Sequence, residues 1–216
     1  MVDTENRWTL PDRASAERWC RERNDLGIRC IIDLLSGAAT TPRQADTSRE
    51  AYLSCIRSIQ QKSLNASVSV KLTTIGAIFD QAFCQESALS LMKEADEREV
   101  GFELDMEGRG LVNYTLGVAL TAAREGYPLT ITLQAYLDRT PVDLEEVLKK
   151  DIRVRLVKGA YVGDTTDFRV IQERFKRGFT ALLDSGKPFS AGTHDPDLIR
   201  WMVDSSGGPK EQVEFS

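Results

Sequence analysis

Short apolar runs alternate along the chain with longer charged runs, and this pattern predicts strands separated by helices. We expect strands at 29–35, 67–73, 101–106, 129–136, 152–158, 188–193 and 212–216. Thr140-Pro141 and Asp195-Pro196 each place a capping residue before a proline, as at the start of a helix, and Gly126 stands where a helix should stop. Such alternation is typical of a parallel sheet with crossover helices.

The number of strands favours a barrel that is short by one unit. An eight-stranded α/β barrel typically needs about 250 residues, and this chain of 216 residues ends on its seventh predicted strand. We therefore predict an α/β, (β/α)8 TIM-barrel-like fold that lacks the eighth strand-helix unit, with residues 1–216 forming a single, C-terminally incomplete domain. Its seventh strand would be an open edge through which the chain could self-associate.

The two faces of the predicted strands differ in character. In the third strand Leu104 lies on the apolar face and Asp105 on the polar face. Ionisable or amide residues also lie on the polar face near the ends of the second, fourth and fifth strands, namely Lys71, Gln134 and Arg155. Barrel active sites lie at the carboxyl ends of the strands, so the pattern predicts a polar barrel mouth. Because buried unpaired charges are costly, we expect Lys71, Asp105 and Arg155 to pair with one another or to bind a ligand. An antiparallel β-sandwich with one solvent-exposed face would show the same alternation and is the alternative to a barrel. The long helical segments between the strands argue against it.

Composition narrows the possible partners. The net charge of −5 is spread along the chain without a basic stripe, so we expect no nucleic-acid partner. The cysteines are Cys20, Cys30, Cys55 and Cys84; they form no C-x-x-C pair, and with a single histidine we predict no metal site and no disulfide framework. The N-terminus resembles neither a signal nor a transit peptide, and no apolar run approaches the roughly 20 residues of a membrane span, so we expect a cytoplasmic protein.

Short motifs at the predicted strand ends resemble those of the proline dehydrogenase family. The strongest is R-L-V-K-G-A-Y, from Arg155 to Tyr161 in the fifth strand and the turn after it. The others are I-D-L-L at 32–35, S-V-K-L at 69–72, L-D-M-E at 104–107, Q-A-Y at 134–136 and T-H at 193–194. Each is weak alone, but their order and spacing span nearly all of the chain after about residue 27.

The resemblance implies an FAD-dependent flavoprotein of proline catabolism. The implied reaction is oxidation of L-proline to 1-pyrroline-5-carboxylate by hydride transfer to the flavin. The reduced flavin would then pass electrons to a quinone-type acceptor, which would bring the cytoplasmic chain to the surface of the inner membrane. The family's last helix carries a pair of arginines that grip the substrate carboxylate, and residues 1–216 contain no matching pair. We therefore expect weaker proline binding and impaired turnover.

The resemblance also implies a role for each matching residue. Asp105 and Arg155 would be catalytic, and Lys71 and Tyr161 would bind the substrate. The implied cofactor-binding residues are Met106, Gln134, Lys158, Gly159, Ala160, Thr193 and His194. The fixed charge of Arg155 would stabilise reduced, anionic flavin, and a lysine at position 158 suits a phosphate group.

Two other functions stay open on the residues alone. The first is a barrel lyase that forms a Schiff base through Lys71 or Lys158. The second is a non-catalytic remnant that binds flavin or another protein through its open edge.

Overall fold

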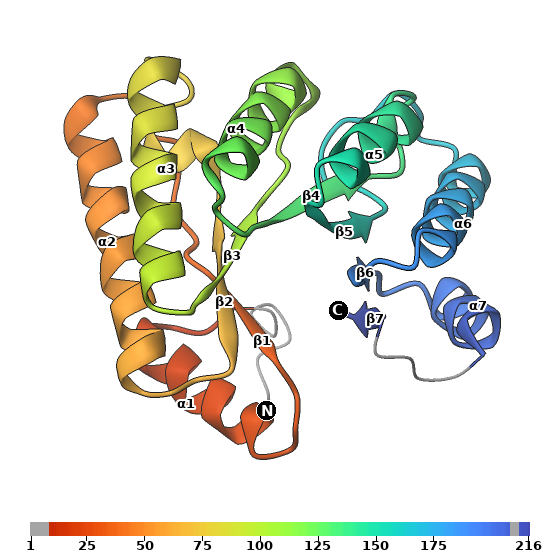
Figure 1. The fold of residues 1–216 in the computed structure, drawn as a ribbon, viewed down its shortest axis with the longest axis horizontal. Helices are drawn as coiled ribbons and strands as arrows, with labels where there is room; N and C mark the ends of the chain where they lie inside the picture. Colours follow the sequence, from red (N-terminus) through yellow and green to blue (C-terminus); the bar gives the residue numbers. More distant parts are fainter. Residues whose placement is uncertain (1–8, 208–211) are drawn as a thin grey trace. The chain divides into compact units, whose positions relative to one another are not determined.

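The computed structural model describes residues 9–207 and 212–216, in which strands and helices alternate (Figure 1). The chain divides into two compact units, of which the first ends at Glu103 and the second runs from Leu104 to Ser216. The strand pairs β1–β2, β4–β5, β5–β6 and β6–β7 are all parallel. Each unit is therefore built of strand-helix repeats, as the sequence predicts.

The first unit holds three strands and the helices that cover them. The strands are β1 (Cys30–Asp33), β2 (Ala66–Val70) and β3 (Gly101–Leu104), whose last residue opens the second unit. The helices are α1 (Arg13–Asn24), α2 (Pro42–Gln61), α3 (Gln81–Glu97) and the short η2 (Leu72–Ile75). Helices α2 and α3 lie side by side, and α2 packs on β2 (Figure 1).

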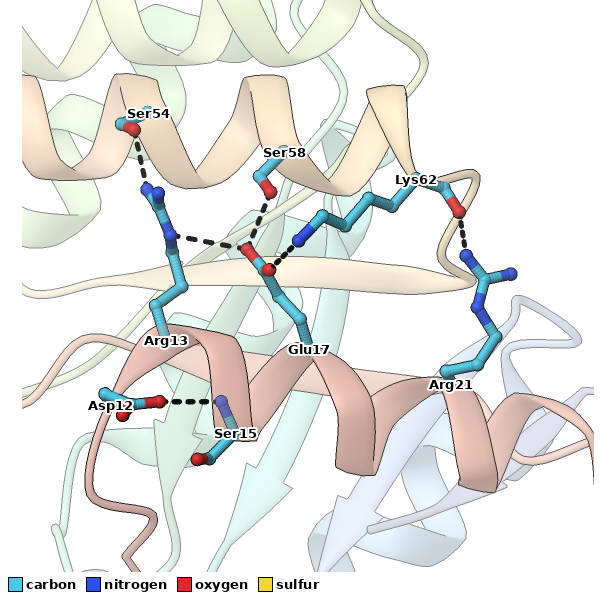
Figure 2. Close-up of polar contacts among 8 residues, drawn as sticks. All are labelled: Asp12, Arg13, Ser15, Glu17, Arg21, Ser54, Ser58 and Lys62. Carbon is cyan, nitrogen blue, oxygen red and sulfur yellow. Dashed lines mark hydrogen bonds and ion pairs between the residues drawn. The ribbon is translucent and has the colours of Figure 1, made fainter.

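A buried carboxylate joins α1 to α2 (Figure 2). Glu17 is 5% exposed and accepts hydrogen bonds from Ser58, at 2.6 Å, and from Lys62. Arg13 lies 3.3 Å from the same carboxylate, and Arg21 donates to the backbone carbonyl of Lys62. These contacts hold α1 along α2 through paired and hydrogen-bonded charge, which is the condition under which a buried carboxylate is tolerated.

The second unit continues the repeat. Its strands are β4 (Thr130–Gln134), β5 (Arg153–Val157), β6 (Phe189–Gly192) and β7 (Val213–Phe215). Its helices are the short η3 (Arg109–Leu111), α4 (Val112–Glu125), α5 (Thr140–Lys149), α6 (Phe168–Asp184) and α7 (Pro196–Ser206). The strands follow one another in sequence order, and α5, α6 and α7 pack each on the next (Figure 1). None of the helices that the structure describes has the length and apolar character needed to cross a membrane.

All seven predicted strands are present, but each is shorter than expected. The second strand ends at Val70 because the chain turns there into η2, and the third ends at Leu104. Lys71 and Asp105 are thus the first residues beyond their strands. Both faces are buried: Val68 and Ser67 are each 0% exposed. The polar face of these strands therefore points to an interior, as the alternation predicts.

Two of the three predicted helix boundaries are confirmed. Asp195 caps α7 by accepting from the backbone N–H groups of the next turn, and Gly126 ends α4 in the left-handed region with φ of 87°. The prediction that Thr140 caps α5 is wrong, because Arg139 occupies the N-cap position. The Thr140 hydroxyl instead donates to the backbone carbonyl of Gln134 at 2.5 Å, which ties the helix start to the end of β4.

Candidate active site

A cavity of about 650 Å³ lies at the carboxyl ends of β4, β5 and β6 in the second unit. Gln134, Val157 and Gly192, which end these three strands, all line it. Ten of the eleven residues expected at the site also line it: Asp105, Met106, Gln134, Arg155, Lys158, Gly159, Ala160, Tyr161, Thr193 and His194. The eleventh, Lys71, belongs to the first unit.

Thr132 and Asp105 hold Arg155 in place on the cavity wall. The parallel register sets Arg155 beside Thr132, and its Nε donates to the Thr132 hydroxyl at 3.2 Å. Its Nη2 donates to Asp105 Oδ1 at 3.0 Å, and the arginine side chain is only 14% exposed. The expected pairing of Asp105 with Arg155 is confirmed. The contacts fix a guanidinium charge at the cavity, where partial burial weakens solvent screening.

Gln134 presents a buried acceptor at the same cavity. Its Nε2 donates to the backbone carbonyl of Met106 at 2.9 Å, and because a carbonyl can only accept, this contact sets the orientation of the amide. Oε1 is buried and has no hydrogen-bond partner in the part of the chain that the structure describes. A buried amide oxygen without a donor is costly, so the site favours a ligand that brings an N–H group.

Lys158 lies between a carboxylate and an aromatic ring. Its Nζ is 3.4 Å from Asp195 Oδ2 and 4.6 Å from the centre of the Phe168 ring. Gln172 also donates to Asp195 Oδ2, at 2.8 Å. Lys158 is 25% exposed at its side chain and lines the cavity. It therefore offers a positioned cation with a share of its surface left for an anionic group.

Asp195 makes three kinds of contact at the cavity wall: with the first turn of α7, with Gln172 and with Lys158. Burial by itself opposes ionisation of this carboxyl, but the hydrogen bonds from Gln172 and from the backbone N–H groups of α7, with the charge of Lys158, outweigh it. The pKa of Asp195 is consequently held below its ordinary value. The ionised side chain caps α7, accepts from Gln172 and pairs with Lys158 at the same time.

The turn after β5 brings backbone close to the cavity. Gly159 has φ of 123°, a conformation that residues with side chains rarely adopt. Gly159, Ala160 and Tyr161 line the cavity, and the Tyr161 side chain is 45% exposed. Glycine is required at position 159 because a Cβ atom there would overlap the Tyr136 ring, and the turn that it permits places backbone at the cavity wall.

Lys71, which was predicted to bind the substrate, has a partner in its own unit. Its Nζ lies 2.5 Å from Asp33 Oδ2, at the ends of β2 and β1. Asp33 was not expected to be this partner. The role of Lys71 in substrate binding stays a prediction.

Seven residues that line the cavity were not expected from the sequence, and among them are three that contact Arg155 or Lys158. Thr132 lies on the polar face of β4, so the alternation of side chains carried a signal for it. Asp195 was expected only as a helix cap, although it directly follows the T-H motif. Phe168 opens α6 and carried no sequence signal, because its contact with Lys158 depends on how the turn folds back.

The donors and acceptors of the cavity fit a flavin nucleotide. The Gln134 acceptor suits a ring N–H of the isoalloxazine, and the Arg155 charge suits a ring that becomes anionic on reduction. Lys158 and the glycine turn suit phosphate oxygens. The residues that would hold the group are thus Gln134, Arg155, Lys158 and the 159–160 backbone.

Solved structures share the fold. A proline utilization A (PutA) structure from Bdellovibrio bacteriovorus, inactivated by N-propargylglycine, superposes with a TM-score of 0.84 over 94% of this chain at 18% identity. A Bradyrhizobium japonicum PutA gives a TM-score of 0.78 over 87% at 21% identity. This chain covers only 27% and 23% of those longer chains. The predicted TIM-barrel-like fold class is thereby confirmed.

Sequence comparison identifies the family. Proline dehydrogenase 1 of Bacillus subtilis is 28% identical over 208 residues, which are 93% of this chain and 69% of the relative. Proline dehydrogenase of Deinococcus radiodurans is 25% identical over 201 residues, 88% of this chain and 65% of the relative. The sequence model described as "Proline dehydrogenase" matches residues 16–169. The family consists of oxidoreductases that act on proline and are generally flavin-dependent, and this chain belongs to the proline dehydrogenase family.

Proposed function

We propose that the cavity of the second unit binds FAD and that the chain oxidises L-proline. The observation that carries the proposal is the buried Gln134 acceptor beside the fixed Arg155 charge, in a cavity lined by the family's motifs. Bound FAD would accept a hydride from the proline ring carbon next to the nitrogen, and loss of the nitrogen's proton would give 1-pyrroline-5-carboxylate.

The residues of β4 and β5 would prepare the site for the flavin ring. Gln134 would accept a hydrogen bond from a ring N–H through Oε1, since its Nε2 already donates to the backbone carbonyl of Met106. Arg155 would oppose the negative charge that the ring gains. Asp105 is a positioning residue in this scheme, because it accepts a hydrogen bond from the Arg155 guanidinium.

The turn and α7 would hold the nucleotide part. Lys158 would bind a phosphate oxygen as a point charge, and the backbone of the turn at Gly159 and Ala160, which lines the cavity, would lie close to the phosphate. Asp195 would keep Lys158 at the cavity wall while it caps α7. Thr193 accepts from the Asp195 backbone N–H at 3.1 Å, which orders the strand end from which His194 would also contact the cofactor.

The geometry disfavours the Schiff-base lyase. A lysine attacks a carbonyl only as an uncharged amine. Lys71 lies 2.5 Å from Asp33 and Lys158 lies 3.4 Å from Asp195, so each ammonium group has a carboxylate partner. The two lysines are consequently better suited to binding anions than to nucleophilic attack.

A titration of the purified full chain with FAD tests the proposal. After dialysis we expect flavin to stay with the protein and to absorb near 450 nm, and adding L-proline should reduce a redox dye at a rate proportional to the loaded protein. A chain that retains no flavin would refute the cofactor assignment. A chain that retains flavin but gives no proline-dependent reduction would refute the substrate assignment alone.

A further inference from the structure

Tyr136, two residues after Gln134, packs against the turn after β5 that lines the cavity. It is 3% exposed, and the segment that follows β5, residues 158–164, wraps around it. The function proposed above assigns no role to Tyr136. The geometry of the segment nevertheless depends on this side chain at several points.

Two glycines meet opposite edges of the Tyr136 ring. A Cβ atom added at Gly159 would overlap Cε1 and Cδ1 of the ring, and one added at Gly163 would overlap Cδ2 and Cε2. Gly159 also needs its φ of 123°, whereas Gly163 lies outside the positive-φ region. At Gly163 the requirement for glycine therefore comes from the tyrosine ring and not from the backbone conformation.

Hydrogen bonds fasten the same segment to Tyr136 at three places. The Tyr136 N–H donates to the Lys158 carbonyl at 3.0 Å, and the Asp164 N–H donates to the Tyr136 carbonyl at 3.3 Å. Between them, the Tyr161 N–H donates to the Tyr136 hydroxyl at 3.2 Å. The first two bonds need only backbone, but the third needs the phenol. The side chain thus orders the middle of the turn.

We propose that Tyr136 is a positioning residue that holds the turn 158–164 in its cavity-lining conformation before any ligand binds. The turn supplies Lys158, Gly159, Ala160 and Tyr161 to the cavity, so its preorganisation lowers the ordering cost of binding. The link to flavin rests on the proposed function, whereas the order of the turn is a property of the chain itself.

Hydrogen exchange of the flavin-free full chain tests the clamp directly. In Tyr136→Phe we expect amides of the 158–164 peptide to exchange about fivefold faster, the effect of one lost hydrogen bond. Tyr52→Phe is the matched control, because Tyr52 is 1% exposed and its hydroxyl bonds to Thr74 in the first unit. The proposal is wrong if Tyr136→Phe leaves this peptide unchanged, or changes it no more than Tyr52→Phe does.

A double-mutant cycle tests the steric part. We expect Gly163→Ala to weaken FAD binding about tenfold and to speed exchange of the turn, because the new methyl group meets the ring. In a Tyr136→Ala background the ring is gone, so Gly163→Ala should add little. An equal effect of Gly163→Ala in both backgrounds overturns the clamp. If the unchanged chain binds no FAD, the proposed function fails, and the exchange data still decide on Tyr136.

Discussion

The two units use similar ion pairs for different ends. In the first unit the Glu17 carboxylate contacts Arg13, Ser58 and Lys62 at the junction of α1 and α2, so its charge is paired with the charges of Arg13 and Lys62 (Figure 2). In the second unit the pairs Arg155–Asp105 and Lys158–Asp195 lie on the wall of a cavity. The same wall carries the Gln134 oxygen, which has no hydrogen-bond partner among the residues that the structure describes. A buried ion pair is weak support for function by itself. What distinguishes the second unit is that both partners of each pair line the same cavity. The first unit has a cavity of its own, of about 780 Å³, but Arg13 lines it without Glu17 or Lys62.

Replacing Arg155 should have the largest effect on function. In Arg155→Met we expect the turnover of proline to fall about 100-fold or more, because a fixed charge opposite the developing charge is lost. Arg124→Met is the matched control, since Arg124 is exposed on α4 and donates to the Thr121 hydroxyl at 3.0 Å. Steady-state kinetics with proline and a redox dye measure both. Turnover of Arg155→Met equal to that of Arg124→Met would remove the arginine from the catalytic machinery.

Replacing Glu17 should have a large effect on the free energy of unfolding and no effect on flavin binding in the cavity of the second unit. In Glu17→Gln we expect the free energy of unfolding to fall by about 2 kcal/mol, because Lys62 and Arg13 lose the carboxylate that pairs with them. Glu97→Gln should be near neutral, since Glu97 and its partner Lys93 are both exposed and 3.8 Å apart. Urea unfolding and flavin retention are the measurements. Loss of flavin from folded Glu17→Gln would break the division of roles between the units.

The comparison also shows which features a sequence can predict. The alternation of apolar and polar residues, as at Leu104 and Asp105, predicted which side chains share a face of a strand. The structure agrees, because burial of one face enforces an alternation with a period of two. The partners of charged residues were harder to predict. Asp33 pairs with Lys71 because of how neighbouring strands align, and the sequence of a single strand does not encode that alignment. Thr140 was misplaced as a cap because the sequence cannot show that its hydroxyl reaches back to Gln134. Phe168 was missed because only the folded turn brings it to Lys158.

Replacing Gln134 should have a moderate effect on the cofactor. In Gln134→Leu we expect FAD to bind about tenfold more weakly, the effect of one hydrogen bond to a buried acceptor. Gln61→Leu, at an exposed position near the end of α2, changes the same groups away from the cavity and should leave flavin binding unchanged. Equilibrium dialysis with FAD compares the two. Equal affinities would mean that the Gln134 oxygen is satisfied in some way other than by the flavin.

The smallest expected effect is a pH dependence that belongs to the first unit. Burial opposes ionisation of Glu17, but hydrogen bonds from Lys62 and Ser58 and the charges of Lys62 and Arg13 outweigh it, so its pKa lies below the ordinary 4.5. A carboxyl with a lower pKa in the folded state stabilises the fold fully above the unfolded value, and that contribution is lost as the pH falls through the folded value. The stability difference between the unchanged chain and Glu17→Gln should therefore be constant from neutral pH down to about 5 and shrink below about 4.5. Urea midpoints between pH 7 and pH 3 measure it, with Glu97→Gln as the reference. A difference that stays constant down to pH 3 would show that the amide introduced by Glu17→Gln, and not the loss of the Glu17 charge, destabilises the junction of α1 and α2.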